Sequence, residues 1–255
     1  MFRGLCLLAC HLLNGNGMEW SDKEMRGAAK RILPSLTWER VGEAVASGKR
    51  VVAMLRHAER PPLDPTDTSF GERLPITARG RAVARRLGRL LAGMVAQGAL
   101  RLYVGNTLRT VQTAEAIVVG MLEGKGGDFP APSEDPVLGG GSPFFGSLAE
   151  RMALIAEGRY RERLNDYYRM GVQRGYRPLG PATDEMEGRL LDLAGPAPGL
   201  TLAVTHDVNV ASFLAGRGVT TSFSRKLWPH YLDAAVIFAG ENVREYGALR
   251  ASALD

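Results

Sequence analysis

Cysteine is nearly absent from this chain of 255 residues. The two cysteines, Cys6 and Cys10, both lie within the first ten residues, so the rest of the chain has no thiol. This excludes a disulfide framework, a cysteine-ligated metal site and thiol catalysis in the folded body. Histidine is also scarce, with four residues in all, so few positions can carry imidazole chemistry.

Long hydrophobic runs are missing as well, and no stretch reaches the length of a membrane-spanning helix. The first residues combine one positive charge with a short apolar run, and the sequence L-L-A-C at 7–10 resembles a lipoprotein cleavage site. We expect residues 1–17 to be a leader or a disordered tail; translation from Met18 is a further alternative. The cytoplasm is favoured as the compartment, and the cell envelope stays open.

The charge of the chain is moderately positive. The formal net charge is +5, with 32 lysines and arginines against 27 acidic residues. Such a balance suits nucleic acid, an anionic surface or an anionic substrate. The arginines at 79–101 and 159–177 have the spacing of solvated helix faces, so we expect no nucleic-acid partner.

Strand and helix patterns alternate along the chain. Compact apolar and β-branched runs indicate buried strands at 49–55, 100–104, 200–205 and 234–238. Helical spacing of apolar residues indicates helices at 76–91, 107–122 and 208–214. This order predicts an α/β fold, namely a three-layer α/β/α sandwich around a mostly parallel sheet.

Two stretches interrupt that alternation. One is the Pro-rich segment at about 61–75, and the other is the long segment at about 123–199, which holds Gly and Pro loops and a charged helical stretch at 148–170. Ligands of open α/β sheets collect at the carboxyl ends of the strands, where the second stretch would form a cap. We expect a single domain over 18–255 with these two insertions.

The segment Arg56-His57-Ala58-Glu59-Arg60 directly follows the first buried strand. Guanidinium groups bind phosphate oxygens in a forked geometry, and an imidazole between them can face the phosphorus atom. A surface loop with incidental arginines is the alternative, since so short a pattern also arises by chance. Its place at a strand end favours a phosphate site.

Two further segments begin helices after buried strands. Thr205-His206-Asp207 gives a second histidine at a strand end, with a carboxylate that could protonate a departing oxygen. Arg109 lies near the start of the helix at 107–122, where the helix dipole already favours an anion. Taken singly, Asp207 could be a helix cap and Arg109 an exposed helix residue.

Four segments together resemble the histidine phosphatase superfamily, which includes the cofactor-dependent phosphoglycerate mutases and the histidine acid phosphatases. They read R-H-A-E-R at 56–60, L-P-I-T-A-R-G at 74–80, L-R-T-V-Q-T-A-E at 108–115 and T-H-D at 205–207. They occur in the family's order and spread over most of the chain.

The resemblance implies a phosphomonoesterase that acts through a phosphohistidine. His57 would attack phosphorus in line, and water would then release phosphate. The substrate would be a small phosphorylated compound, and neither a metal nor another cofactor is expected. The side chains that would hold the equatorial oxygens are Arg56, Arg60, Arg109 and His206.

The proton donor is less closely defined by the resemblance. Mutase-like branches take a glutamate from a loop after the arginine-bearing helix, whereas the acid phosphatase branch uses the aspartate after the second histidine. The matching loop here, at 137–143, has no carboxylate, although Glu134 and Asp135 lie just upstream. We therefore assign Asp207 as the donor and keep those two as alternatives. Gly105 also departs from the family, which often has a serine there.

Two other functions stay open. A phosphoglycerate mutase-type phosphoryl transferase is disfavoured by the missing loop carboxylate. A phospho-ligand binding module without catalysis is disfavoured because binding alone would need neither the nucleophile His57 nor the acid Asp207. We expect His230 to pack beside Trp228; a place in the wall of a pocket is the alternative. The oligomeric state is left open.

Overall fold

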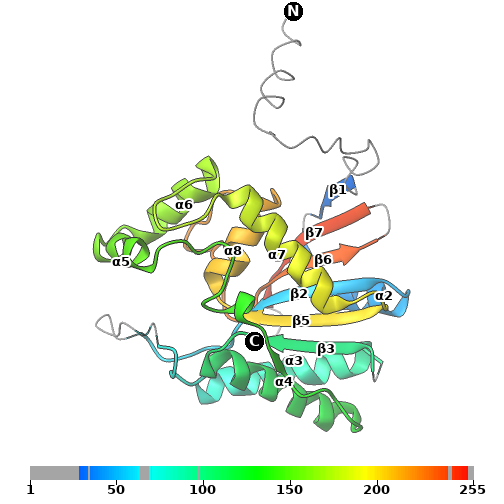
Figure 1. Ribbon diagram of the computed structural model, residues 1–255. Helices are drawn as coiled ribbons and strands as arrows, with labels where there is room; N and C mark the ends of the chain where they lie inside the picture. The colour runs from blue at the N-terminus through cyan, green and yellow to red at the C-terminus, as the bar shows by residue number, and fades with distance from the viewer. Residues whose placement is uncertain are drawn as a thin grey trace, which may run out of the picture.

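The computed structural model describes residues 29–33, 35–63, 69, 71–96, 98–240 and 243–251 of the chain. Seven strands form one central sheet in the order β1-β7-β6-β2-β5-β3-β4 (Figure 1). They are β1 (Ala29–Ile32), β2 (Arg50–Arg56), β3 (Leu100–Val104), β4 (Ser133–Glu134), β5 (Gly199–Thr205), β6 (Ala234–Ala239) and β7 (Val243–Leu249). Neighbouring strands are parallel except where β6 pairs with β2 and β7, so the predicted mostly parallel sheet is confirmed.

Helices cover both faces of the sheet and complete the predicted three layers (Figure 1). The helices are α2 (Trp38–Ala46), α3 (Ala78–Met94), α4 (Leu108–Lys125), α5 (Leu148–Ala156), α6 (Tyr160–Met170), α7 (Leu179–Ala194) and α8 (Asp207–Gly216), with the short 3-10 helix η1 (Pro136–Leu138). One face carries α2, α3 and α4, and the other carries α7 and α8. No helix within the described residues is long and apolar enough to cross a membrane.

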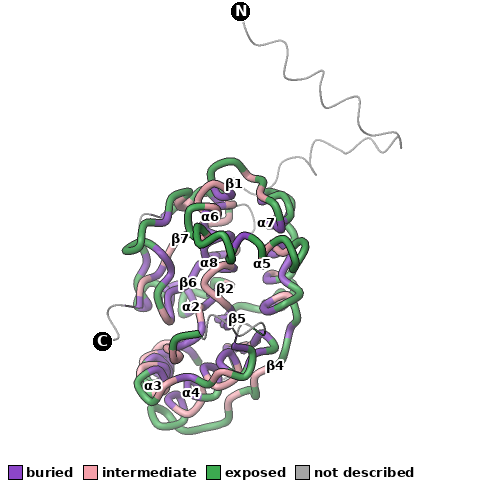
Figure 2. Tube along the Cα trace, turned by 90° about the vertical axis from the view of Figure 1, so that its left-hand side faces the viewer, coloured by how far each residue is buried: buried purple, intermediate pink, exposed green. Residues whose placement is uncertain are grey.

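The two faces have separate hydrophobic cores because successive strand residues point to opposite sides. In β2, Val51 and Leu55 join the core beneath α2, α3 and α4, whereas Val52 and Met54 join the core beneath α7 and α8. Both cores are therefore built on the same short strand, as expected of a strand whose inner residues, 51–55, are all apolar. The strands β2 and β5 are buried along nearly their whole length, while α5 is mostly exposed (Figure 2).

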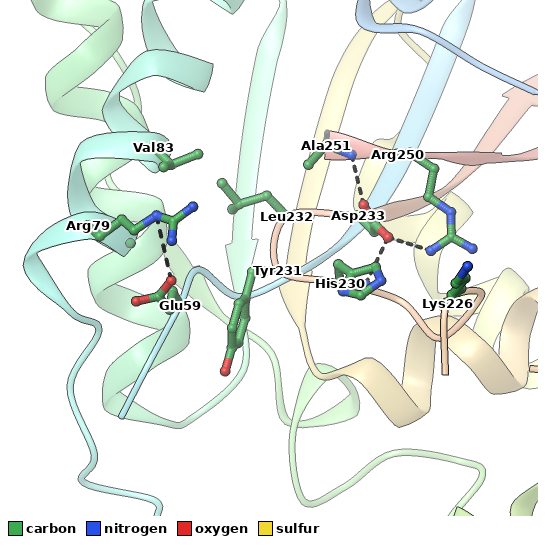
Figure 3. A pocket seen from close by; sticks show the side chains of 11 residues that line it. Glu59, Arg79, Val83, Lys226, His230, Tyr231, Leu232, Asp233, Arg250 and Ala251 are labelled. Atoms are coloured by element: carbon green, nitrogen blue, oxygen red, sulfur yellow. Dashed lines mark hydrogen bonds and ion pairs between the residues drawn. The ribbon is translucent and has the colours of Figure 1, made fainter. Parts of the chain in front are cut away.

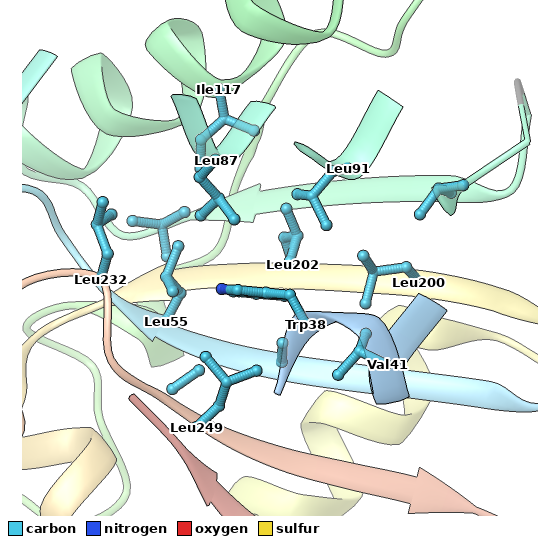
Figure 4. Close-up of a cluster of buried hydrophobic side chains, with 14 of the residues drawn as sticks. Trp38, Val41, Leu55, Leu87, Leu91, Ile117, Leu200, Leu202, Leu232 and Leu249 are labelled. Carbon is cyan, nitrogen blue, oxygen red and sulfur yellow. The ribbon is translucent and has the colours of Figure 1, made fainter. Parts of the chain in front are cut away.

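Large side chains from three helices fill the first core (Figure 4). Trp38 of α2, Leu91 of α3 and Ile117 of α4 pack over Leu202 of the central strand β5. The helices α3 and α4 approach closely, since a Cβ atom on Gly88 would lie 2.0 Å from the carbonyl oxygen of Ile117. Only glycine permits that approach, which holds α4 and its first turn against α3.

The predicted strands all occur, with boundaries shifted by at most one residue, and the helix predicted from residue 76 begins at Ala78 with Thr77 as its N-cap. The charged stretch at 148–170 forms two helices, α5 and α6, on the side of the carboxyl ends of β2 and β5 (Figure 1). Helix α7, also within 123–199, instead packs on the sheet. Residues 1–17 lie outside the described residues.

A buried ion cluster joins α7 to the edge of the sheet. The carboxylate of Glu187 is 2% exposed and lies 2.5 Å from Nη2 of Arg217 and 2.5 Å from Nη1 of Arg244. The hydroxyl of Tyr246 donates to the same carboxylate at 3.0 Å. Because Arg217 is only 4% exposed, loss of the buried carboxylate would leave its guanidinium with the exposed Asp184, at 2.7 Å, as its carboxylate partner.

We predict that Glu187→Ala lowers the free energy of unfolding by about 3–5 kcal/mol, as expected when one member of a buried ion pair is removed. The matched control is Glu185→Ala in the same helix, since Glu185 forms an exposed pair with Arg177 and its loss should cost less than about 1 kcal/mol. Urea unfolding of both variants measures the difference. Equal, small losses in the two variants would contradict a structural role for the buried cluster.

Candidate active site

Five of the six predicted site residues lie at the ends of two adjacent strands, and the sixth, Arg109, lies on helix α4. In the parallel pairing of β2 with β5, Arg56 lies opposite Thr205. The backbone N–H of His57 then donates to the carbonyl oxygen of Thr205 at 2.9 Å, which continues the strand pairing by one residue. As a result, His57 and His206 lie side by side, with ring centroids 5.5 Å apart and planes inclined by 67°.

Three predicted arginines are each held by a backbone carbonyl. Nη1 of Arg56 donates to Pro229 at 2.6 Å, and Nη1 of Arg60 donates to Pro61 at 2.8 Å. Nη1 of Arg109 donates to Gly71 at 2.5 Å. A carbonyl fixes a guanidinium without neutralising it, so these contacts keep the positive charge available to an anion.

Arg109 is brought to the two histidines by helix α4. It is the second residue of that helix, is 7% exposed, and places Nη2 3.4 Å from Nδ1 of His206. Burial, followed by the nearby guanidinium of Arg60, lowers the pKa of Arg109 to about 10. Arg109 therefore remains charged at neutral pH, beside the positive end of the α4 dipole.

His57 is 3% exposed and has its proton fixed on one nitrogen. Its Nδ1 lies 2.8 Å from the carbonyl oxygen of Ala58, which accepts and so requires the hydrogen on Nδ1. Burial, then the charges of His206 and Arg56, lower the pKa of His57 well below 6.5. At neutral pH the ring is uncharged, and Nε2 carries a free lone pair.

His206 is the N-cap residue of α8, and it too is neutral at pH 7. Burial and the neighbouring Arg109 lower its pKa to about 3, despite the opposing effect of Asp207. The hydrogen-bonding capacity of its ring, rather than a permanent charge, is thus what His206 offers an anion in the free protein.

Asp207 is the carboxylate of the site and is tightly held. Its Oδ2 accepts from Nε1 of Trp228 at 3.0 Å and lies 3.1 Å from Nη2 of Arg56, while Oδ1 accepts from the N–H of Val208. Burial alone would raise the pKa of this carboxyl, but Arg56 and Trp228 outweigh it and lower the pKa to about 2. Asp207 is ionised in the free protein.

The two alternative carboxylates do not join this group. Asp135 is 2% exposed, accepts from Nε of Arg189 at 3.0 Å, and accepts from the N–H of Val137 as the cap of η1. Glu134 is exposed on the edge strand β4. Asp135 therefore has a structural environment, and Glu134 faces outward.

Gly105 also has a structural explanation. A Cβ atom there would lie 2.6 Å from the carbonyl oxygen of Leu138, so a serine has no room. The same carbonyl accepts from the hydroxyl of Thr205 at 2.6 Å. Because η1 packs closely against the ends of β3 and β5, no space is left for a serine side chain at residue 105.

Sequence reasoning missed two aromatic residues of the site. The ring of Tyr231 lies 4.3 Å from the guanidinium of Arg56 and 5.8 Å from the ring of His57. Trp228 is buried and bonds Asp207. No motif marks either residue, since both belong to a loop that reaches the site only through the antiparallel strand β6. His230, expected beside Trp228, is instead exposed.

No protein-family model matches the sequence, and no curated protein matches it either. Among solved structures, phosphoglycerate mutase from Bacillus anthracis str. Sterne is similar over 81% of this chain and 96% of its own, with a TM-score of 0.50 and 12% identity. The chain has the phosphoglycerate mutase fold. The fold that the resemblance implies is thus confirmed.

Two further solved structures are similar to this chain. A phosphoserine phosphatase mutant from Entamoeba histolytica, in complex with phosphoserine, has 11% identity over 77% of this chain and 94% of its own, with a TM-score of 0.48. The protein histidine phosphatase SixA, complexed with tungstate, has 17% identity over 80% of this chain and 99% of its own, with a TM-score of 0.43.

We predict that Trp228→Phe raises the pKa of the Asp207 carboxyl from about 2 toward the ordinary range of aspartic acids, because the ionised form loses one hydrogen-bond donor. A titration of the carboxyl carbon by NMR measures this directly. Trp38→Phe is the matched control, since the Nε1 of Trp38 is buried without a partner. An unchanged pKa in the Trp228 variant would show that the indole does not stabilise the carboxylate.

Proposed function

We propose that the protein is a metal-independent phosphomonoesterase in which His57 accepts the phosphoryl group of a small phosphorylated compound. The observation that carries this proposal is the protonation state of His57. Its Nδ1–H donates a hydrogen bond to the carbonyl oxygen of Ala58, so Nε2 has a free lone pair and lies among cations. An uncharged, oriented imidazole is the form that attacks phosphorus, and it needs no separate base.

The charge around His57 supports the same chemistry. Arg56, Arg60 and Arg109 remain positive, and one carboxylate, Asp207, lies among them. A phosphoryl dianion entering this site would replace water by guanidinium donors, and those donors would stabilise the equatorial oxygens in the transition state. His206, bonded to Arg109, would contribute a further hydrogen bond.

The reaction would proceed in two displacements. Nε2 of His57 forms a bond to phosphorus as the bond to the leaving oxygen breaks, and Asp207 gives its proton to that oxygen. In the second step Asp207 takes a proton from water, the water oxygen bonds to phosphorus, and the bond to Nε2 breaks. Phosphate is released, and both residues return to their first state.

Asp207 must carry a proton for the first displacement, although it is ionised in the free protein. A bound dianion would place negative charge next to Asp207. It would also compete for the Arg56 guanidinium, which stabilises the ionised form of Asp207 in the free protein. Both effects raise the pKa of the carboxyl. Substrate binding would in this way prepare the proton donor.

A phosphoglycerate mutase-type transferase is the second candidate, supported by the fold that the chain shares with such an enzyme. The absence of a carboxylate from the loop at 137–143 favours hydrolysis instead. A binding module without catalysis would gain nothing from a buried neutral histidine aimed at the anion. Phosphatase assays separate these alternatives.

We expect His57→Ala to lower kcat for an aryl phosphate by about 10³-fold or more, as the loss of a nucleophile does elsewhere. The assay is run in chelator, and alkaline quenching of wild type with labelled substrate should trap an acid-labile phosphohistidine that the variant lacks. Glu43→Gln, on the exposed face of α2, serves as the control. Activity that requires an added metal, or that survives without His57, would refute the mechanism.

Asp207→Asn should act differently on good and poor leaving groups. We expect hydrolysis of an alkyl phosphate to fall by about 10²–10⁴-fold, because its leaving oxygen needs a proton. The value of kcat/KM for 4-nitrophenyl phosphate, which reports the first displacement, should fall much less because its leaving group is stable as an anion. Glu134→Gln is the matched variant, and a selective loss there instead would assign proton donation to the upstream carboxylate.

A further inference from the structure

A pocket of about 480 Å³ lies beside the candidate active site (Figure 3). Its wall includes Glu59, two residues after His57, and Tyr231, whose ring centroid is 5.8 Å from that of His57. The pocket is of a size that suits a small organic ligand. The pocket is therefore bounded by Tyr231, whose ring is next to that of the proposed nucleophile, His57.

The carboxylates of this pocket are already engaged. Asp233 accepts from Nη1 of Arg250 at 2.6 Å and from the N–H groups of His230 and Ala251, each at 2.8 Å. Glu59 accepts from the hydroxyl of Thr77 at 2.9 Å and forms an ion pair with Nε of Arg79 at 3.9 Å. Neither side chain is left to neutralise an additional cation of the pocket wall.

Lys226 is such a cation. It lines the pocket, it is exposed, and no carboxylate of the described residues forms an ion pair with its ammonium group. The exposed ring of His230 lies in the same wall and adds a possible hydrogen-bond donor (Figure 3). This side of the pocket offers a site for a carboxylate or a similar anion.

The remaining wall is apolar. Val83 of α3 and the buried Leu232 face the pocket together with the ring of Tyr231 (Figure 3). The Arg56 guanidinium lies over that ring, 4.3 Å from its centroid, so Tyr231 contacts both the pocket and an arginine of the proposed phosphate site. An apolar body that packs on Tyr231 could reach both Lys226 and the phosphoryl site.

We propose that this pocket receives the leaving group of the substrate, and that the leaving group has an apolar body and a carboxylate that pairs with Lys226. The proposal rests on the phosphomonoesterase function above and narrows its substrate to phosphorylated organic acids. In this proposal Lys226 selects the substrate by its carboxylate and takes no part in the chemical step at phosphorus or at the leaving oxygen.

The test compares 4-carboxyphenyl phosphate with 4-carbamoylphenyl phosphate, which have nearly the same shape and differ in charge. We expect wild type to favour the carboxylate in kcat/KM, and we expect Lys226→Met to lower the ratio of the two kcat/KM values about tenfold, as the loss of one charge-assisted hydrogen bond does. Lys125→Met, at the far end of α4, should leave the ratio unchanged.

Binding of the leaving group itself is measured separately. Calorimetric titration with 4-hydroxybenzoate should give a dissociation constant about tenfold weaker for Lys226→Met than for wild type. If both phosphates are hydrolysed and neither the ratio nor this constant responds to Lys226, the pocket proposal is overturned and the phosphatase stands. If neither phosphate is hydrolysed, the phosphatase proposal fails, and the titration alone decides whether Lys226 binds the carboxylate.

Discussion

The register of one parallel strand pair sets the positions of both histidines in the candidate site. Because Arg56 of β2 lies opposite Thr205 of β5, the residues that follow both strands leave the sheet at the same level. The hydrogen bond from His57 to Thr205 extends the pairing just far enough to hold both histidines in place. A shift of one residue would turn His57 to the other face and separate the imidazoles.

This register brings several cations together, and the surrounding structure must hold them there. The carbonyls of three loops, at Pro61, Gly71 and Pro229, fix the arginines without lowering their charge. Burial and neighbouring cations lower the pKa values of both histidines below the ordinary value, so both imidazoles are neutral. The site is thus electropositive through its arginines, while its imidazoles remain neutral.

Much of this arrangement could be predicted from the sequence because it is local. The runs at 49–55, 100–104 and 200–205 are rich in apolar and β-branched residues, which predicts buried strands, and the motifs of the site follow them. The strands β1, β4 and β7 are not predicted, since β1 and β4 are short and exposed and β7 is exposed at its start. Helix α7 was counted within an insertion because Gly and Pro loops precede it.

The site residues that were missed depend on tertiary contacts rather than on spacing. Tyr231 and Trp228 lie in the loop between α8 and β6, and only the antiparallel pairing of β6 with β2 returns that loop to the strand ends. Gly105 illustrates the same limit, since its lack of a side chain reflects the carbonyl of Leu138 in a distant segment. No local pattern contains such information.

The tight hold on Asp207 has a consequence for the order of events at the site. Arg56 lies between the carboxylate of Asp207 and the ring of Tyr231, and it is also one of the groups expected to bind phosphate. A guanidinium that is shared by two anions stabilises each of them less than it would stabilise a single anion. Phosphate binding and the ionisation of Asp207 therefore oppose each other. A proton would therefore be taken up as the dianion binds. The protonated form of Asp207 would thus arise only when a substrate is bound. In the absence of substrate, Asp207 would be a carboxylate.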